Sequence, residues 1–246
     1  MAKQIALITG GAQGIGYACA EALSEDGYQV ILADVKDSVH AAAEKLGGTG
    51  MICDMGDPEA IHALFDRIEA EHGPVAALVN NAGVALAGDF LSYTLEDFQK
   101  VIDINLRGVF VATQRAANTM VEKGIEGAIV NMSSINAQVA IPAISAYCAS
   151  KGGVMQLTKV AALALADKNI RVNAVGPGSI DTEMIAGINT DKAAMDKALS
   201  RTPLKRIGTA REIGNVVAFL CSDKASYITG ETIYADGGRL GLNYTC

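Results

Sequence analysis

The sequence predicts a doubly wound α/β fold, in which one seven-stranded parallel sheet carries helices on both faces. Short runs of strand character alternate with helical patterns along the 246 residues. The first of these runs, QIALIT, is continuously apolar, as expected of a strand buried on both faces. A glycine-rich turn then leads directly into a helical pattern. We expect residues 1–246 to form a single domain, because one α/β domain often reaches this length.

Each expected element rests on a local pattern. The strands are expected at residues 4–9, 29–34, 50–54, 75–80, 127–133, 170–175 and 231–235. Helical spacing covers 14–24, 57–72, 94–123, 143–167 and 210–222, with 94–123 either one long helix or a broken one. Pro58 falls in a first helical turn, where its missing N–H costs little. The charged stretch 181–209 breaks the rhythm, and we expect residues 184–207 to form a lid over a substrate.

Composition excludes several classes of protein. Half of the residues are apolar, which excludes a disordered chain. The net charge is −7 and no basic run occurs, so neither nucleic acid nor a membrane surface is an expected partner. The five cysteines form no CxxC pair, so we expect no metal site and no disulfide framework. We found no signal peptide and no apolar stretch near the roughly 18 residues of a membrane span, and we expect a cytoplasmic protein.

The glycine-rich turn has the spacing Gly10-x3-Gly14-x-Gly16. Glycine at the start of a helix lets a pyrophosphate approach free backbone N–H groups, so the turn is consistent with a dinucleotide site in a Rossmann-type domain. It is not a Walker A loop, because Tyr17 stands where lysine is required. Alone, the turn is also compatible with a tight structural turn.

Asp34 strengthens the interpretation as a dinucleotide site. It ends the second expected strand, close to the offset of about 20 residues at which an acidic residue binds the adenosine ribose. A carboxylate there accepts from the ribose hydroxyls and repels a 2′-phosphate. No lysine or arginine lies within 10–16. We therefore expect NAD, with NADP less favoured, although Lys36 lies close by.

Several motifs in register, the glycine turn among them, give the chain a resemblance to the classical short-chain dehydrogenase/reductase family over nearly its whole length. Besides the glycine turn they are the run Asn80-Asn81-Ala82-Gly83, a serine at Ser134, the pair Tyr147-x3-Lys151, the loop Pro177-Gly178 with Ile180 and Thr182, and the final Asp236-Gly237-Gly238. Asn105 and Asp54 also match single positions of the family pattern.

The resemblance implies four catalytic residues. Tyr147 exchanges a proton with the substrate oxygen, Ser134 binds that oxygen, and Lys151 lowers the pKa of the tyrosine and binds the nicotinamide ribose. Asn105 is expected to hold a water that links Lys151 to solvent. Tyr147 and Lys151 lie four apart on an expected helix and so share one face. A nearby ammonium favours the phenolate over the phenol.

Two sets of binding residues complete the expectation. For the cofactor they are Gly10, Gln13, Gly14, Ile15, Gly16, Asp34, Val35, Asp54, Met55, Asn81, Ala82, Gly83, Tyr147, Lys151, Pro177, Gly178, Ile180 and Thr182. For the substrate they are Ser134, Asn136, Val139, Ile144, Tyr147, Gly178, Ser179 and Met184. The substrate set is mostly small or apolar, which favours a small neutral secondary alcohol or ketone that is cyclic, aryl-alkyl or a polyol.

Other functions compete with this one. A reductase of 3-oxoacyl groups on acyl carrier protein is the alternative within the family, and a non-catalytic NAD-binding sensor is an alternative of another class. A serine hydrolase is disfavoured, because no GxSxG occurs and all three histidines precede the fifth expected strand. The alanine-rich helix at 143–167 and the final residues RLGLNYTC offer apolar surface, so we expect a homotetramer, as is usual in the family.

Overall fold

The computed structural model describes residues 3–183 and 192–241, and it has the predicted fold class. Seven parallel strands lie in the order β3-β2-β1-β4-β5-β6-β9. Their bounds are β1 (Ile5–Thr9), β2 (Gln29–Asp34), β3 (Thr49–Ile52), β4 (Val75–Asn80), β5 (Ala128–Met132), β6 (Arg171–Pro177) and β9 (Thr232–Ala235). The strand order reverses between β1 and β4, where ligands bind beyond the carboxyl ends of such strands.

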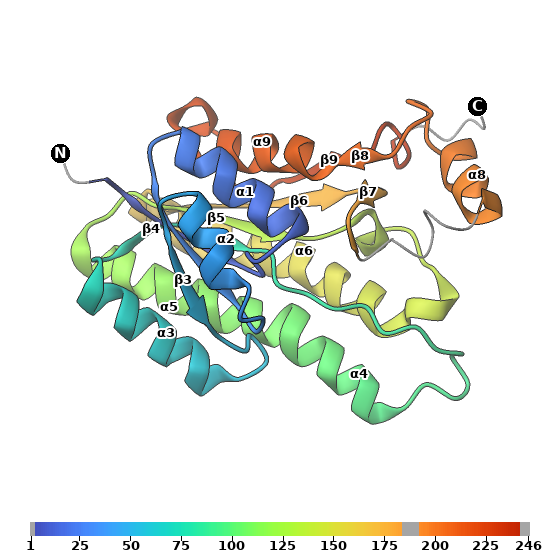
Figure 1. Ribbon diagram of the computed structural model, residues 1–246, viewed down its shortest axis with the longest axis horizontal. Helices are drawn as coiled ribbons and strands as arrows, with labels where there is room; N and C mark the ends of the chain where they lie inside the picture. The colour runs from blue at the N-terminus through green and yellow to red at the C-terminus, as the bar shows by residue number, and fades with distance from the viewer. Residues whose placement is uncertain (1–2, 184–191, 242–246) are drawn as a thin grey trace.

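Helices cover both faces of the sheet. Figure 1 shows α1 (Gly14–Glu25) and α9 (Ala210–Cys221) along one side, and α3 (Pro58–Glu71) and α5 (Gly108–Lys123) along the other. Alternate residues of β1 divide between two cores: Ile8 packs in the cluster under α1 and α9, and Leu7 in the cluster under α3 and α5. The continuous apolar run at 4–9 therefore reports burial on both faces, as predicted.

The helix expected at 94–123 is broken. It consists of α4 (Leu95–Ile102), a π-helical turn (Asp103–Arg107) and α5. A π turn inserts one extra residue into the helical ladder and often marks a functional site. The helix expected at 143–167 is α6 (Ser145–Leu165), and a short 3₁₀ turn (Pro142–Ile144) precedes it.

Four short elements have no counterpart in the sequence-based expectation. The seven-residue helix α2 (Val39–Lys45) connects β2 and β3. Within the charged stretch, β7 (Ile180–Asp181) pairs with β8 (Gly208–Thr209), and α8 (Lys192–Ser200) lies between them in sequence. The expected lid at 184–207 thus includes α8, whereas 184–191 lies outside the described residues.

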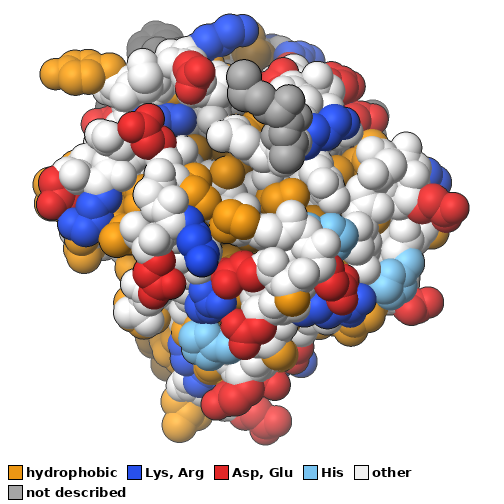
Figure 2. All heavy atoms as spheres, turned by 90° about the vertical axis from the view of Figure 1, so that its left-hand side faces the viewer, with side chains coloured by type: hydrophobic (Ala, Val, Ile, Leu, Met, Phe, Trp, Pro, Cys, Tyr) orange, Lys and Arg blue, Asp and Glu red, His pale blue; other side chains and the backbone are white. Residues whose placement is uncertain are grey.

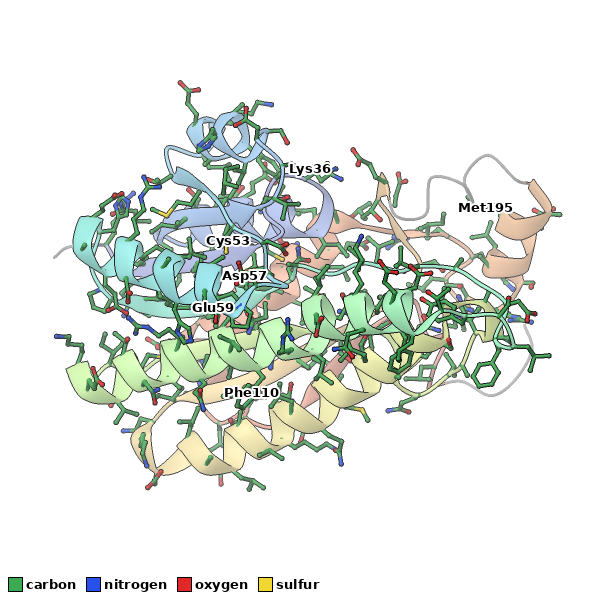
Figure 3. All side chains as sticks on the ribbon, turned by 90° about the horizontal axis from the view of Figure 1, so that it is seen from below. Lys36, Cys53, Asp57, Glu59, Phe110 and Met195 are labelled. Carbon is green, nitrogen blue, oxygen red and sulfur yellow. The ribbon has the colours of Figure 1, made fainter. Side chains whose placement is uncertain are left out.

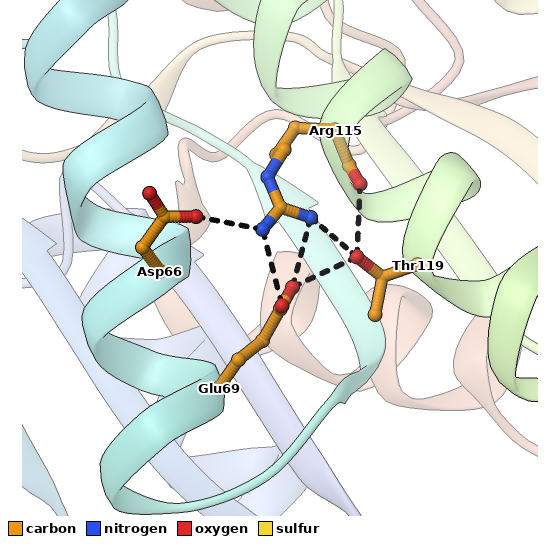
Figure 4. A network of polar contacts seen from close by, with 4 residues as sticks. All are labelled: Asp66, Glu69, Arg115 and Thr119. Atoms are coloured by element: carbon orange, nitrogen blue, oxygen red, sulfur yellow. Dashed lines mark hydrogen bonds and ion pairs between the residues drawn. The ribbon is translucent and has the colours of Figure 1, made fainter.

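Arg115 joins α5 to α3 through a cluster of polar contacts, drawn in Figure 4. Its guanidinium donates to Asp66 at 2.9 Å and to Glu69 at 3.1 Å, and it also contacts Thr119. The Thr119 hydroxyl donates to Glu69 at 2.8 Å. The guanidinium carbon lies 5.7 Å from the centre of the Phe65 ring. These contacts hold together two of the helices that cover one face of the sheet.

The start of α3 follows the expected pattern. The Asp57 side chain accepts from the backbone N–H of Glu59 at 3.0 Å, and Pro58 occupies the first turn. Figure 3 labels Asp57 and Glu59 at this end of the helix. Negative side chains at a helix N-terminus are favoured by its partial positive charge, and hydrogen bonds from the Ala60 backbone and from Glu59 lower the pKa of Asp57.

The surface seen in Figure 2 mixes acidic, basic and apolar side chains, and no basic stripe crosses that face. Of the helices in the described ranges, none has the length and apolar character that crossing a lipid bilayer requires. Within those same ranges, no three His, Cys, Asp or Glu side chains gather in a metal-binding group.

Candidate active site

The glycine turn is tied to the end of β4. Gly10 has a φ of +65°, and a Cβ there would lie 2.9 Å from the Ala82 Cα. A Cβ on Gly16 would clash with the Gly10 carbonyl oxygen, so only glycine fits there. The Thr9 hydroxyl accepts from the N–H groups of Asn81 and Ala82, both at 3.0 Å. The turn and the Asn81–Gly83 run therefore form one rigid unit.

The Asn81 side chain completes this connection. Its Nδ2 donates to the carbonyl oxygens of Thr9 at 3.0 Å and Gly10 at 3.1 Å. No side chain caps the first turn of α1, so its backbone N–H groups keep the arrangement that binds phosphate. Thr182 lies beside this turn, with its Cγ2 3.6 Å from the position of a Cβ on Gly14. The structure thus brings three of the predicted cofactor segments together: the glycine turn, the Asn81–Gly83 run and the loop at Thr182.

Asp34 lies half-buried at the end of β2 and is oriented from both sides. Its Oδ2 accepts from the Ala12 N–H at 3.1 Å, and its Oδ1 from the Lys36 N–H at 3.0 Å. These contacts hold the carboxylate beside the glycine turn, as the ribose-binding prediction requires.

Lys36, labelled in Figure 3, has partners of its own. Its Nζ donates to Gln13 Oε1 at 2.8 Å and lies 3.5 Å from Glu183 Oε2. The Gln13 amide also donates to Glu183. The cation nearest Asp34 is therefore engaged by a polar and an acidic side chain. Sequence reasoning did not select Glu183, because it follows Gln13 by 170 positions.

The other predicted cofactor residues differ in whether their side chains are exposed or packed in the core. Asp54 is exposed, and its Oδ1 accepts from the Gly56 N–H at 2.8 Å. Val35 is exposed as well. Met55 is buried and contacts Cys53 in the core, and Ile15 packs against the core under α1. The side chains of Met55 and Ile15 thus serve packing.

Lys151 is a buried cation near the centre of the site. Its side chain is 3% exposed, and its Nζ donates to the Met132 carbonyl at 2.7 Å. The same Nζ lies 5.5 Å from the centre of the Tyr147 ring. Burial lowers the pKa of Lys151 to about 8, because a low-dielectric environment disfavours the charged form.

Tyr147 meets Ser134 across the site. Burial raises the pKa of Tyr147 above its ordinary value, while the hydrogen bond with Ser134 acts in the opposite direction. Burial therefore outweighs the lowering of this pKa that we expected from Lys151. The ammonium of Lys151 is itself desolvated and bound to a carbonyl, so its effect on the phenol is weaker than the cost of burial.

Ser134 also organises the substrate segment. Its hydroxyl accepts from the Asn136 N–H at 3.1 Å and so caps a 3₁₀ turn (Ile135–Ala137). Asn136 Nδ2 donates to the Val139 carbonyl at 3.0 Å. Ile144 lies immediately before α6, half-buried. The predicted substrate residues Asn136, Val139 and Ile144 thus lie on the connection between Ser134 and Tyr147.

Asn105 occupies the π turn and is fully buried. Its Oδ1 accepts from the Val84 N–H at 2.9 Å, and its Nδ2 donates to the Val84 carbonyl at 2.9 Å and to Ser150 Oγ at 3.1 Å. Both amide hydrogens are therefore in use. A water held by Asn105, as predicted, would therefore have to donate to Oδ1 or to the backbone carbonyl of this residue. A Cβ on Gly83 would lie 3.3 Å from Asn105 Oδ1 and 3.5 Å from Lys151 Nζ, which places Gly83 between them.

The end of β6 supplies the remaining predicted residues. Pro177 ends the strand, the Gly178 N–H donates to the Ala235 carbonyl at 3.1 Å, and Ile180 is buried. Ser179 Oγ accepts from Arg239 at 3.2 Å. Ser179 and Ile180 line a cavity of about 430 Å³ with Leu204, Glu212 and Tyr234, and neither Tyr147 nor Ser134 lines it. Met184 lies outside the described residues.

Three buried hydroxyls next to the predicted residues were missed. Thr9 ties the turn to β4, Ser133 Oγ donates to the Lys151 carbonyl at 3.1 Å, and Ser150 Oγ donates to the Tyr147 carbonyl at 2.7 Å. Each is adjacent in sequence to a residue that we selected. This adjacency is the sequence signal that could have identified them.

Together, the fold and the site define a dinucleotide-dependent oxidoreductase of the Rossmann type. A family model described as "Enoyl-(Acyl carrier protein) reductase" matches residues 10–239. The chain belongs to the short-chain dehydrogenase/reductase family.

Relatives of known name span almost the whole chain. The NADP-dependent (R)-specific alcohol dehydrogenase of Lentilactobacillus kefiri is 38% identical over 96% of this chain and 96% of that protein. The 3-oxoacyl-(acyl-carrier-protein) reductase of Thermotoga maritima is 39% identical over 96% and 97%. The crystal structure of a gluconate 5-dehydrogenase from Burkholderia cenocepacia, in complex with NADP and tartrate, superimposes with a TM-score of 0.94 at 30% identity, covering 98% and 97%.

Proposed function

We propose that this oxidoreductase transfers hydride between NAD(H) and a small neutral secondary alcohol or ketone, with Tyr147 as general acid and base. The observation that carries the proposal is the convergence of Ser134, Tyr147 and Lys151 at one site. Tyr147 takes the proton from the alcohol during oxidation and returns it during reduction. Ser134 binds the same oxygen and orients it toward Tyr147.

The residues fit a nicotinamide dinucleotide. The glycine turn gives the backbone N–H groups of α1 access to a diphosphate, and Asp34 is oriented to accept from ribose hydroxyls. Lys151, buried beside Gly83, would hold the nicotinamide ribose. When bound, the cofactor supplies the hydride acceptor or donor, and the protein supplies positions and electrostatics.

NAD is our choice of cofactor, although a relative is NADP-dependent and another was solved with NADP. The supporting contacts are those of Asp34 and Lys36. A 2′-phosphate beside Asp34 would meet a fixed carboxylate, and the ammonium of Lys36 is shared by Gln13 and Glu183. Charge repulsion therefore acts against NADP.

The alternative substrate is a 3-oxoacyl group on acyl carrier protein, which the Thermotoga maritima relative favours. An acidic carrier needs uncompensated basic residues at the mouth of the site. Arg206 is held by Glu212 through bonds of 2.9 and 2.5 Å, which favours the small substrate. Enoyl reduction is less favoured, since Tyr147 and Lys151 lie four residues apart and such reductases space them more widely. A non-catalytic sensor would not need the complete set of Ser134, Tyr147 and Lys151.

The test is turnover of NAD and NADP in parallel with a panel of secondary alcohols and ketones. We expect NAD-dependent oxidation of at least one small alcohol, and a loss of about 100- to 10,000-fold in kcat for Tyr147→Phe because the general base is removed. Circular dichroism of the variant controls for folding. Undiminished activity of Tyr147→Phe would contradict the mechanism.

We further propose that residues 1–246 act as one domain in a cytoplasmic homotetramer. The family assignment and the apolar side chains exposed on α5 and α6 support this proposal.

A further inference from the structure

We propose that Ser150 is a positioning residue that links the π turn at Asn105 to the helical turn carrying Tyr147 and Lys151. The inference rests on the proposed function, because it concerns the geometry of that catalytic pair. Ser150 lies on α6 between the two residues and is fully buried. Its hydroxyl bonds to the Asn105 amide and to the backbone of Tyr147, not to the Tyr147 phenol.

The Ser150 hydroxyl accepts one hydrogen bond and donates another. Its Oγ accepts from Asn105 Nδ2 at 3.1 Å and donates to the Tyr147 carbonyl at 2.7 Å. Asn105 is in turn fixed by the backbone of Val84 through two bonds of 2.9 Å. A continuous chain of hydrogen bonds thus connects the segment after Gly83, the π turn and the first turn of α6. Such chains hold their members in a single arrangement.

The bond to the Tyr147 carbonyl acts on the shape of α6. A serine hydroxyl that bonds a carbonyl of the preceding helical turn competes with the backbone ladder and bends the helix. Lys151, one residue later, is held by Ser133, whose Oγ donates to the Lys151 carbonyl at 3.1 Å. The backbones of Tyr147 and Lys151 are therefore each fixed by a buried hydroxyl from outside the helical ladder. Their side chains emerge from the segment between these two attachments.

The π turn gives this link its purpose. The extra residue in the ladder directs Asn105 into the interior, where it faces both Val84 and Ser150. Without the Ser150 hydroxyl, one Asn105 N–H loses its acceptor, and the Tyr147 carbonyl loses its second donor. The helical turn then relaxes, and the distance between the Tyr147 oxygen and Lys151 Nζ is no longer fixed.

Thr158 provides a matched control on the same helix. Its Oγ1 donates to the Val154 carbonyl at 2.8 Å and accepts from Asn131 Nδ2 at 3.0 Å, and the residue is fully buried. It therefore repeats the bonding of Ser150, about two turns beyond Lys151 and about three turns beyond Tyr147. Ser150→Ala and Thr158→Val each remove one buried hydroxyl that accepts a hydrogen bond from an asparagine amide and donates another to a helix carbonyl.

The experiment compares kcat, KM and the pH profile of kcat for wild type, Ser150→Ala and Thr158→Val. We expect kcat of Ser150→Ala to fall about 10- to 100-fold, as a small misplacement of a catalytic group does, with KM for NAD changed less than about threefold. The acid limb of its profile should move to higher pH, because the phenolate loses part of its support from Lys151. Thr158→Val should keep the wild-type kcat and profile.

The inference is overturned if Ser150→Ala keeps the wild-type kcat and pH profile, or if both variants lose activity equally without a shift in pH profile. If Ser150→Ala does not fold, Ser150→Cys, which keeps the volume with a weaker donor, is judged by the same criteria. Failure of the proposed function gives a different result, in which wild type turns over no alcohol or Tyr147→Phe retains full activity.

Discussion

Burial shifts the two central side chains of the site in opposite directions. It lowers the pKa of Lys151 to about 8 and raises the pKa of Tyr147, because burial disfavours the charged form of each group. The protonation of this pair is therefore sensitive to a charge added nearby. A nicotinamide cation, once bound, favours the phenolate that the buried lysine alone does not produce.

The buried lysine has a measurable effect on stability. Between pH 8 and 10.5 the unfolded chain keeps a proton on Lys151 that the folded chain has lost, so the free energy of unfolding rises with pH in this window. Without cofactor, the free energy of unfolding of wild type minus that of Lys151→Met should rise by about 2 kcal/mol between pH 7 and pH 10. Urea denaturation of both proteins at the two pH values measures this difference. A difference independent of pH would show that the lysine stays charged in the folded state.

A second prediction concerns Asp34 and the choice of cofactor. Asp34→Ala removes the acceptor of two backbone N–H groups and the charge that repels a 2′-phosphate. We expect NAD to bind about 10- to 100-fold more weakly while NADP binding holds or improves, as measured by calorimetry. Asp37→Ala removes the same charge from a fully exposed carboxylate and should leave both affinities near wild type. Tighter binding of NADP by wild type would contradict our cofactor assignment.

At the scale of elements, the contacts of Arg115 connect α3 to α5. The guanidinium is 19% exposed and serves Asp66 and Glu69 together. We expect Arg115→Met to lower the free energy of unfolding by about 1–3 kcal/mol, because it leaves the partly buried Glu69 carboxylate without its partner. The matched control is Arg67→Met, which breaks an exposed pair with Glu71 and should cost less than about 1 kcal/mol. Equal losses would assign the effect to general surface charge.

The elements predicted well are those with a repeating pattern. All seven strands of the sheet were found: β1, β4 and β5 are buried along their whole length, and the less buried β3 and β9 still follow the alternation of strands and helices. β7 and β8 escaped, since two residues carry no periodicity, and seven residues of α2 carry little. The π turn was anticipated only as a break, because an extra residue in the ladder has no composition of its own.

The site was predictable to the extent that its motifs are local. Tyr147 and Lys151 share a helical face, and Asp34 ends a strand at a known offset from the turn. Glu183 meets Lys36, and Ser150 meets Asn105, only after the chain has folded. The raised pKa of Tyr147 was missed for the same reason, because the depth of burial is a property of the assembled site.

At the scale of the whole molecule, apolar side chains on α5 and α6 face outward. Val160 and Leu163 on α6 are 64% and 82% exposed, and Phe110 on α5 is 46% exposed. We expect Leu163→Arg to shift the proposed tetramer toward smaller species in sedimentation equilibrium, because a charge enters an apolar contact. Ile52→Arg, at a 52% exposed position on β3, is the control and should leave the mass unchanged. A wild-type monomer would remove the proposal, and the predicted contribution of 242–246 lies outside the described residues.

The position of β9 has a consequence during protein synthesis. It follows every other strand of the sheet in sequence, yet it pairs with β6, and Asn173 on β6 bonds to the backbone of Ile228 and Glu231 just before it. While the ribosome is still translating this region, β6 is an uncovered edge with open hydrogen-bonding groups, the kind of surface that recruits chaperones or aggregates. Stalled or truncated chains that stop before Thr232 should therefore be cleared by proteolysis, even though all of the proposed cofactor-binding residues precede Thr232.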